Sequence, residues 1–300
     1  MTGPAASIVA QAKLNLHLRV LAREPSGFHS LETIFHRIDL GDEISVWATS
    51  GERTIDVEGA DVGPAESNLA FKAASAYSHR AGWPRGFRID LNKRVPVGAG
   101  MGGGSADAAA VLRILDSLAP DSMGSHALMD LGASLGSDVP FLVGDAVMAL
   151  AWGRGEKLSP LPPLPRRDVL LMTPDFSVPT ADAYAWLDLD RTGAGNSTPA
   201  SDYATSSLAS RPPLMTWEGL AAWAWNDFEP VIVARHPELG EMLAKLRGSR
   251  PVFSGMTGSG STIFGILDGP LDFARVPAPH RTRVRSTMSA IDVVQPLRIE

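Results

Sequence analysis

Hydrophobic and polar residues alternate over residues 87–95, and hydrophobic residues recur every three to four positions over residues 105–118. The first spacing is typical of a strand with one buried face, and the second is typical of a helix that packs one side against a core. Similar patterns predict further strands at 16–21, 44–48, 54–58, 168–172, 251–254 and 262–267, a hairpin over 144–158 that turns at 153–155, and further helices at 70–80, 125–135, 180–187, 217–225 and 237–246.

The order of these elements favours an α+β fold in two domains. Strands are grouped before helices and do not alternate strictly with them, which argues against a doubly wound parallel sheet. Residues 159–165 read Ser-Pro-Leu-Pro-Pro-Leu-Pro, and a proline-rich segment of this kind marks a domain boundary. We therefore expect domains at 1–160 and 161–300, with a mobile surface loop at 190–213 that is rich in Ser, Thr, Ala, Gly and Pro.

A cluster of glycines separates the strand at 87–95 from the helix at 105–118. Residues 96–108 read Pro-Val-Gly-Ala-Gly-Met-Gly-Gly-Gly-Ser-Ala-Asp-Ala. A strand, a glycine turn and a helix start together place several backbone N–H groups at the positive end of a helix. Small side chains let an anion approach those groups closely, so the cluster predicts a phosphate-binding loop.

Two known phosphate-loop patterns fit this cluster less well. Gly98, Gly100 and Gly103 match the dinucleotide pattern G-x-G-x-x-G, which expects an acidic residue about 20 positions on, at the end of the next strand. The acids in range, Asp116 and Asp121, lie in or just after the predicted helix. The Walker pattern fails because no lysine separates the glycines from the serine that follows them. Two interpretations of the cluster remain: a third type of phosphate loop, or a tight glycine turn that binds no ligand.

Composition narrows the class of protein further. The chain of 300 residues carries a net charge of −6 and has a pI near 5.7, which provides no basic surface for nucleic acid or for an anionic membrane. It contains no cysteine, which excludes disulfides, thiolate metal sites and a cysteine nucleophile. The N-terminus lacks a secretory pattern, and the most apolar span, 139–152, is too short to cross a bilayer. We expect a cytoplasmic protein with small-molecule partners, and neither nucleic acid nor membrane among them.

Three segments together resemble the GHMP kinase superfamily of small-molecule kinases. They are Ala-Lys-Leu-Asn-Leu-His-Leu at 12–18, the glycine cluster, and Gly-Met-Thr-Gly-Ser-Gly-Ser at 255–261, and they follow the order of the family. Further segments narrow the resemblance to the branch that acts on a diphosphocytidyl-methylerythritol, and the similarity is collinear from about residue 10 to about residue 267. These segments are 27–33 (Gly-Phe-His-Ser-Leu-Glu-Thr), 135–141 (Leu-Gly-Ser-Asp-Val-Pro-Phe), 153–156 (Gly-Arg-Gly-Glu), 178–180 (Val-Pro-Thr) and 226–229 (Asn-Asp-Phe-Glu).

The resemblance implies both a fold and a reaction. The fold would be the two-domain GHMP kinase fold, with a ribosomal-S5-like N-terminal domain, a ferredoxin-like C-terminal domain and the active site in the cleft between them. The reaction would be the ATP-dependent phosphorylation of the 2-hydroxyl of 4-diphosphocytidyl-2-C-methyl-D-erythritol in the non-mevalonate isoprenoid pathway, with Mg²⁺, by a monomer or weak homodimer. The alternatives are another GHMP kinase, for homoserine, mevalonate or a sugar, and a non-catalytic ligand sensor on the same fold.

The resemblance also implies a catalytic pair and an ATP site. Asp138 occupies the position of the superfamily's catalytic aspartate and would accept the proton, while Lys13 would keep that carboxylate ionised. Taken alone, Asp138 is typical of a loop or capping residue and Lys13 of a solvated lysine. Ser105 is either a contact of phosphate or Mg²⁺ or the N-cap of the helix. The expected ATP site comprises Pro96, Val97, Gly98, Ala99, Gly100, Met101, Gly102, Gly103, Gly104, Ser105 and Ala106, with Asn68 and Lys93 at the adenine.

The expected substrate site combines aromatic and polar residues from both halves of the chain. Phe28 and Tyr184 would stack on the two faces of the cytosine, and His29 would hydrogen-bond to its edge. Either aromatic residue alone is more typical of a hydrophobic core. Asn15 and Thr180 would bind the methylerythritol hydroxyls and the diphosphate.

The chain departs from the family pattern at a few positions. Pro25 and Ser26 stand before Gly27, where the usual motif has an aspartate. Phe28 replaces a commoner tyrosine, which removes a hydrogen bond but keeps the stacking face. Ala99 replaces a commoner glycine of the loop and is tolerable wherever its φ angle is negative.

Overall fold

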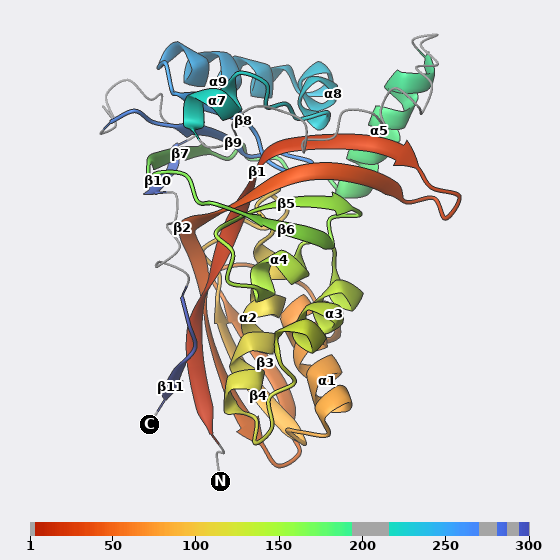
Figure 1. Cartoon of the computed structure of the whole chain (residues 1–300), viewed down its shortest axis with the longest axis vertical. Helices are drawn as coiled ribbons and strands as arrows, with labels where there is room; N and C mark the ends of the chain where they lie inside the picture. Colours follow the sequence, from red (N-terminus) through yellow and green to blue (C-terminus); the bar gives the residue numbers. More distant parts are fainter. Residues whose placement is uncertain (1–3, 194–215, 270–280, 287–293, 300) are drawn as a thin grey trace.

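Two long strands, β1 (Ala5–Arg23) and β2 (His29–Thr49), pair antiparallel along most of their length. Figure 1 shows this hairpin, in red to orange, running from the lower sheet to the upper right of the view, where its tip lies beside the helix α5 (Thr180–Gly193). The hairpin therefore contacts both halves of the molecule. The structure is a computed structural model that describes residues 4–193, 216–269, 281–286 and 294–299.

The sequence predicts only residues 16–21 of β1 and 44–48 of β2. Apolar and polar residues alternate from Ala10 to Val20 of β1, although residues 10–18 are all buried, so this pattern indicates a strand longer than residues 16–21. The pairing with β2 shifts register at three points between Gln11 and Arg23, and in β2 neighbouring residues of one kind, such as Ile34 and Phe35, break the alternation. The prediction for β1 is therefore shorter than its own pattern, and most of β2 is hidden from a prediction that relies on alternation.

The first sheet has seven strands within the described part of the chain. Besides β1 and β2 it contains β3 (Arg53–Glu58), β4 (Gly86–Asn92), β5 (Met148–Gly153), β6 (Lys157–Leu161) and β11 (Leu297–Ile299). Its order is β11-β1-β2-β4-β3, and β5 pairs with β2 and with β6. The antiparallel pair of β5 and β6 confirms the hairpin predicted over 144–158.

The C-terminal strand β11 belongs to this first sheet. It pairs antiparallel with residues 5–7 of β1. The predicted division at residue 160 assigns residues 297–299 to the second domain. In the structure these three residues instead belong to the sheet of the first half. The position of the boundary itself stays a prediction.

Helices of the first half cover one face of this sheet (Figure 1). They are α1 (Leu69–Ala81), α2 (Gly103–Leu118), α3 (Ser125–Leu135), α4 (Val139–Val143) and the short 3-10 helix η1 (Ala65–Ser67). Helix α2 lies in the centre of the core, where Ala108, Val111, Leu112 and Leu115 are completely buried. The sequence predicts a connector where α4 lies, because five residues are too few for a helical period to be detected.

The second half contains a four-stranded antiparallel sheet of order β10-β7-β9-β8 within the described residues. Figure 1 shows its helices, in blue and cyan, above this sheet. Buried leucines such as Leu239 and Leu243 fix α9 against the sheet. The elements are β7 (Asp168–Met172), β8 (Phe253–Met256), β9 (Ile263–Ile266), β10 (Arg281–Ser286), α7 (Trp217–Ala221), α8 (Phe228–Arg235) and α9 (Pro237–Gly248).

Some predicted boundaries in this half are wrong. Helix α5 continues to Gly193, so residues 190–193 are helical where the composition predicts a mobile loop, and residues 194–213 lie outside the described residues. The helix predicted over 217–225 ends at Ala221. Helix α8 is not predicted, because its buried residues cover only about two turns. None of the described helices is long and apolar enough to cross a membrane.

Candidate active site

A cavity of about 620 Å³ lies where the glycine cluster, strand β1 and the second half of the chain meet. Its wall includes Lys13 from β1, Asp138 at the start of α4, Tyr184 from α5 and Ser259 from the second glycine-rich turn. Residues far apart in the sequence are therefore brought together here. The cavity has the position that the sequence predicts for the active site, between the two halves.

The two glycine-rich turns pack backbone against backbone at this cavity. A Cβ atom added at Gly100 would lie 2.2 Å from the carbonyl oxygen of Thr257, and one added at Gly258 would lie 2.7 Å from the carbonyl oxygen of Gly100. Both glycines also have positive φ angles, +78° and +59°. Ala99, between two glycines with positive φ, is not among the residues with a positive φ, so alanine is tolerated there as predicted.

Thr257, in the second glycine-rich turn, hydrogen-bonds to both strand β1 and the glycine cluster. Its hydroxyl accepts a hydrogen bond from the backbone N–H of Asn15 at 2.9 Å and donates to the carbonyl oxygen of Gly100 at 3.2 Å. The side chain is completely buried. The sequence marks residues 255–261 as a motif but gives this threonine no role, because only the tertiary structure brings it against β1.

The positive end of α2 faces the cavity. The helix begins at Gly103, and Gly102 precedes it as an N-cap that offers no side-chain hydrogen bond. Residues 102–105 line the cavity, so the first backbone N–H groups of the helix are available to an anion. Ser105 lies inside the first turn and is not the N-cap, and its hydroxyl lies 3.9 Å from the position of a Cβ atom at Gly136.

Lys13 is a buried cation with three acceptors. Its Nζ atom lies 3.1 Å from Asp138 Oδ2 and donates to Asn15 Oδ1 at 2.6 Å and to the carbonyl oxygen of Gly100 at 3.2 Å. The Lys13 side chain is 4% exposed and the Asp138 side chain 27%. An ammonium has three N–H donors, so these contacts fix its direction. The predicted pair is therefore in contact, and its carboxylate stays accessible from the cavity.

Asp138 occupies the N-cap position of α4, but its side chain makes no capping hydrogen bond. Its backbone is helical, with φ −83° and ψ −19°. The carboxylate is thus directed to Lys13 and not to the helix. The structure contradicts the interpretation of Asp138 as a capping residue and that of Lys13 as a solvated lysine.

Gly102 has no room for a side chain beside this pair. A Cβ atom there would lie 2.8 Å from Lys13 Cε and 3.5 Å from Asp138 Oδ2, and the φ angle of Gly102 is +70°. Glycine at this position therefore allows the loop to pass directly over the lysine.

A second buried lysine lies beneath the start of α2. Lys93 Nζ donates to Asp42 Oδ2 at 2.5 Å and to Asp107 Oδ2 at 2.8 Å. Burial raises the pKa of Asp107 to about 7, although the charge of Lys93 acts to lower it. Lys93 lines the cavity as expected, but its ammonium already has two carboxylate partners. The sequence does not indicate Asp42 or Asp107, whose partners come from distant segments.

The remaining predicted ATP residues mostly lie at the cavity. Asn68 lines it and caps α1, because its Oδ1 accepts from the backbone N–H of Ala70 at 2.8 Å. Ala106 is the exception. It is buried in the hydrophobic core and does not belong to the cavity wall. The predicted residues on the wall are Pro96, Val97, Gly98, Ala99, Gly100, Met101, Gly102, Gly103, Gly104, Ser105, Asn68 and Lys93.

Two of the predicted substrate residues have polar partners within the site. The Asn15 side-chain amide is committed to its own neighbours, since Oδ1 accepts from Lys13 and Nδ2 donates to Thr33 Oγ1 at 2.8 Å. Thr180 Oγ1 lies 3.1 Å from Ser259 Oγ, and both residues line the cavity. The sequence misses Ser259 as a site residue, although its glycine-rich motif is visible.

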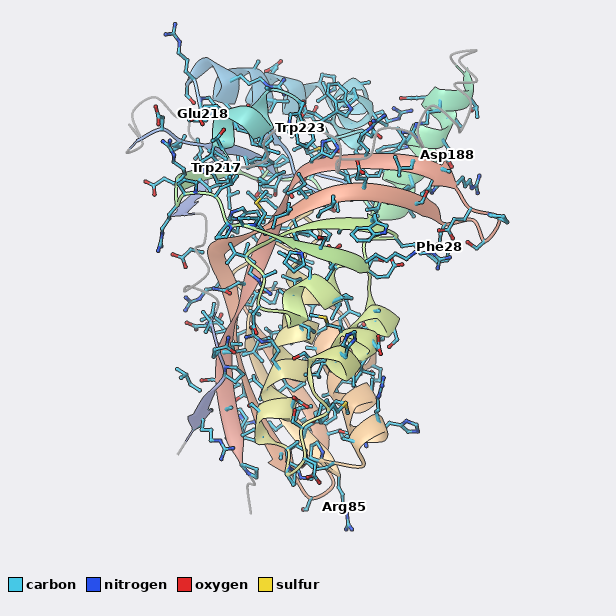
Figure 2. All side chains as sticks on the ribbon, in the orientation of Figure 1. Phe28, Arg85, Asp188, Trp217, Glu218 and Trp223 are labelled. Carbon is cyan, nitrogen blue, oxygen red and sulfur yellow. The ribbon has the colours of Figure 1, made fainter. Side chains whose placement is uncertain are left out.

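The predicted aromatic sandwich is not assembled. Phe28 is 58% exposed, lies outside the cavity wall, and has the guanidinium of Arg154 at 4.1 Å from its ring centroid. Figure 2 shows Phe28 near the outer end of the β1–β2 hairpin, with Asp188 of α5 nearby. The Tyr184 ring stacks on His29 at 4.9 Å, and His29 Nε2 lies 2.9 Å from Asp188 Oδ1. The structure therefore joins His29 and Tyr184, but neither His29 nor Phe28 belongs to the cavity wall.

Comparison with known proteins agrees with this geometry. Residues 68–146 match the family described as GHMP kinases N terminal domain. The 4-diphosphocytidyl-2-C-methyl-D-erythritol kinase of Solibacter usitatus (strain Ellin6076) is 39% identical over 264 residues, which are 87% of this chain and 81% of the relative. That of Pelotomaculum thermopropionicum (strain DSM 13744 / JCM 10971 / SI) is 38% identical over 92% of this chain and 93% of the relative. The chain belongs to the family of 4-diphosphocytidyl-2-C-methyl-D-erythritol kinases.

Solved structures confirm the fold. The crystal structure of 4-(cytidine 5'-diphospho)-2C-methyl-D-erythritol kinase matches with a TM-score of 0.71 and 33% identity, over 94% of this chain and 98% of that one. The homoserine kinase from Cytophaga hutchinsonii ATCC 33406 matches with a TM-score of 0.65 at 16% identity, over 98% of this chain and 97% of that one, which shows the fold alone. The predicted α+β fold of the GHMP kinases is confirmed.

The raised pKa of Asp107 predicts a pH-dependent stability. The folded state holds this proton more tightly than the unfolded state, so the stabilisation is present below about pH 4 and is lost as the pH rises toward about 7. Asp107→Asn has no carboxyl group to titrate at this position. Its free energy of unfolding therefore falls less between about pH 4 and about pH 7 than that of the wild type. Urea unfolding at several pH values measures the difference.

The exposed Asp121 provides the control for this prediction. Asp121→Asn keeps the pH dependence of the wild type. If Asp107→Asn also keeps it, Asp107 is ionised in the folded protein over the whole range.

Proposed function

We propose that this chain is a kinase that transfers the γ-phosphoryl group of ATP to the 2-hydroxyl of 4-diphosphocytidyl-2-C-methyl-D-erythritol, a step of the non-mevalonate isoprenoid pathway. The contact of Lys13 with Asp138 on the wall of a cavity that also holds the start of α2 carries the proposal. Relatives named for this reaction, at 38–39% identity over most of the chain, support the substrate. In this proposal the cavity would offer backbone N–H groups to phosphate, a carboxylate as the base and the Tyr184 ring to the nucleobase.

The triphosphate of ATP would lie on the glycine cluster. Backbone N–H groups of residues 102–105 stand at the positive end of α2, where they favour phosphate oxygens. Lys93 lies beneath Gly103, and because Asp42 and Asp107 balance its charge it would support the start of α2 without adding net positive charge. We propose that the adenine lies toward Asn68, where the cavity wall also contains Val62 and Leu69.

Mg²⁺ fits this site as an ion carried on the nucleotide. Within the described residues, no group of three or more His, Cys, Asp or Glu side chains is placed to hold a metal ion. Magnesium in phosphoryl-transfer sites keeps several water molecules and needs few protein oxygens beside the phosphates. The Ser105 hydroxyl on the cavity wall would be one such ligand. When bound, the ion neutralises charge on the phosphates.

Asp138 would accept the proton of the substrate hydroxyl. The neighbouring Lys13 ammonium, 3.1 Å from Asp138 Oδ2, would orient this carboxylate, which stays accessible from the cavity. We propose that Asn15 acts on Lys13 and not on the substrate, because its Oδ1 is already bonded to that ammonium. Alignment of the hydroxyl with the γ-phosphate then supplies most of the remaining acceleration.

The nucleobase and diphosphate of the substrate would lie toward the second half of the chain. Tyr184 offers an aromatic face on the cavity wall, and burial raises its pKa to about 12, which keeps the phenol protonated at neutral pH. The hydroxyls of Thr180 and Ser259 are 3.1 Å apart and would donate to the diphosphate or to the polyol. His29 stacks on Tyr184 and would hydrogen-bond to the base from there.

The setting of the enzyme follows from the same proposal. We propose a cytoplasmic enzyme that works as a monomer or a weak homodimer. The net charge of −6 supports small-molecule partners over nucleic acid. We also propose two domains, at 1–160 and 161–300, with residues 297–299 of the second pairing with strand β1 of the first sheet.

A panel of alcohols tests the reaction itself. With ATP, we expect ADP release with diphosphocytidyl-methylerythritol and little with free methylerythritol, mevalonate, homoserine or galactose, because the cavity reaches to the aromatic face of Tyr184. Turnover of mevalonate or homoserine at a comparable rate would favour another GHMP kinase. The absence of turnover with every alcohol, together with ligand binding, would favour a sensor.

Lys13 and Asp138 should behave as one catalytic unit. Asp138→Asn and Lys13→Met each lower kcat by about 10²–10⁴, the range for general-base catalysis, and the double variant costs little more than the worse single one. Steady-state kinetics give kcat, and titration checks that both ligands still bind. Losses that multiply in the double variant would show two separate roles, and a fully active Asp138→Asn would show that no base is needed.

The arrangement of the aromatic residues predicts unequal roles for Tyr184 and Phe28. Tyr184→Ala raises the KM for the cytidyl substrate about five- to hundredfold, since base stacking contributes about 1–3 kcal/mol. Phe28→Ala raises it less, because this ring lies outside the cavity wall. Tyr184→Phe keeps the ring and serves as the matched control. A larger effect for Phe28→Ala would show that the hairpin tip closes over the base.

A further inference from the structure

Arg37 is a buried cation in β2 that the proposed chemistry does not use. Arg37 is 2% exposed, and its guanidinium donates hydrogen bonds to four backbone carbonyl oxygens. Burial lowers the pKa of Arg37 to about 9, which reflects the cost of removing this cation from water. Burying an arginine without a carboxylate partner is costly, so the element that carries these carbonyl groups gains a strong anchor.

The four carbonyl groups belong to the end of α4 and the turn after it. Nη2 donates to Phe141 at 2.9 Å, to Leu142 at 3.0 Å and to Gly144 at 2.7 Å, and Nε donates to Ala146 at 3.0 Å. The last carbonyl groups of a helix have no partner within the helix, and here they are buried. Arg37 therefore acts as the C-terminal cap of α4.

Asp138 stands at the other end of the same helix. The helix has only five residues, and a helix of this length is not stable by itself. The backbone N–H of Leu142 donates to the carbonyl oxygen of Asp138 at 3.3 Å, which connects the capped end to the carboxylate-bearing residue. The place of the Asp138 carboxylate thus depends on how the far end of α4 is anchored.

A stack of rings connects Arg37 to Lys13 as well. The guanidinium lies 5.2 Å from the centroid of Phe141, Phe141 stacks on Phe35 at 5.1 Å, and Lys13 Nζ lies 5.4 Å from the centroid of Phe35. Lys13 and Arg37 are also register partners across β1 and β2. Arg37 therefore contacts the supports of both members of the pair, although it does not itself line the cavity.

We propose that Arg37 is a positioning residue that holds Lys13 and Asp138 at their working distance, by capping α4 and by holding Phe141 against Phe35. The proposal rests on the kinase function proposed above. It adds a residue that contacts neither ATP nor the alcohol.

The kinetic test uses Arg37→Met. The variant lowers kcat about ten- to hundredfold, the cost of a misplaced reacting group, while both KM values stay within about twofold. The control is Arg113→Met, since Arg113 is a neighbouring arginine of α2 that bonds to Asp145 and Gln295 and to none of these four carbonyl groups. Arg113→Met keeps the kcat of the wild type. Unchanged kcat in folded Arg37→Met, or a loss confined to KM, overturns the proposal.

A double variant separates positioning from a general loss of structure. In the Asp138→Asn background, Arg37→Met lowers kcat by less than about threefold further, because its effect passes through Asp138. A further loss as large as that in the wild-type background shows that Arg37 acts elsewhere and overturns the proposal. Arg37→Lys keeps the charge but not the planar fork of donors, so we expect its kcat to lie between those of the wild type and Arg37→Met.

Amide hydrogen exchange tests the same inference without turnover. In Arg37→Met and Arg37→Lys, the amides of Leu142 and Gly144 exchange faster than in the wild type, while the amide of Ala119 at the end of α2 is unchanged. Unchanged exchange at Leu142 and Gly144 overturns the capping role even if the wild type proves inactive. An inactive wild type with altered exchange overturns the proposed function and leaves the anchoring of α4 by Arg37 supported.

Discussion

The site depends on the contacts that the buried ammonium of Lys13 makes. A buried cation must find partners within the protein, because its desolvation is otherwise too costly. Lys13 meets Asp138 from the start of α4, Asn15 from its own strand and the carbonyl oxygen of Gly100 from the glycine cluster. These partners come from three separate segments of the chain. One side chain therefore fixes where the strand, the loop and the short helix lie relative to one another.

The close approach of the two glycine-rich turns is the second constraint. Gly100 and Gly258 bring the halves together where any side chain would collide with backbone, and Thr257 bonds to both β1 and the loop. The cavity lies at this contact, so the distance between the glycine cluster and the second half is set by backbone atoms. Backbone contacts of this kind leave little freedom for the walls of the cavity to drift apart.

Buried charge recurs beneath the site in three different forms. Lys13 is offset by a carboxylate that stays accessible from the cavity, Lys93 by two buried carboxylates, and Arg37 by four carbonyl dipoles. Accessibility distinguishes them, since Asp138 is 27% exposed while the side chains of Asp42 and Asp107 are 0% and 4% exposed. The exposed carboxylate is available to a substrate, whereas the buried charges can only support the elements around it.

The sequence by itself determined the α+β class, most helices and the glycine cluster between a strand and a helix, because these depend on local periodicity and on motifs that are contiguous in the chain. The contact between Lys13 and Asp138 is predicted only through the resemblance to a family. The predicted spans of β1 and β2 are too short: β1 alternates over more residues than the predicted strand covers, and in β2 neighbouring apolar residues such as Ile34 and Phe35 break the alternation. Only the tertiary structure decided that Phe28 lies outside the cavity, that Asn15 bonds to Lys13, that Asp107 bonds to Lys93 and that Arg37 bonds to the end of α4. Each of these depends on partners that are distant in sequence, and the burial that makes such contacts strong exists only once the chain has folded.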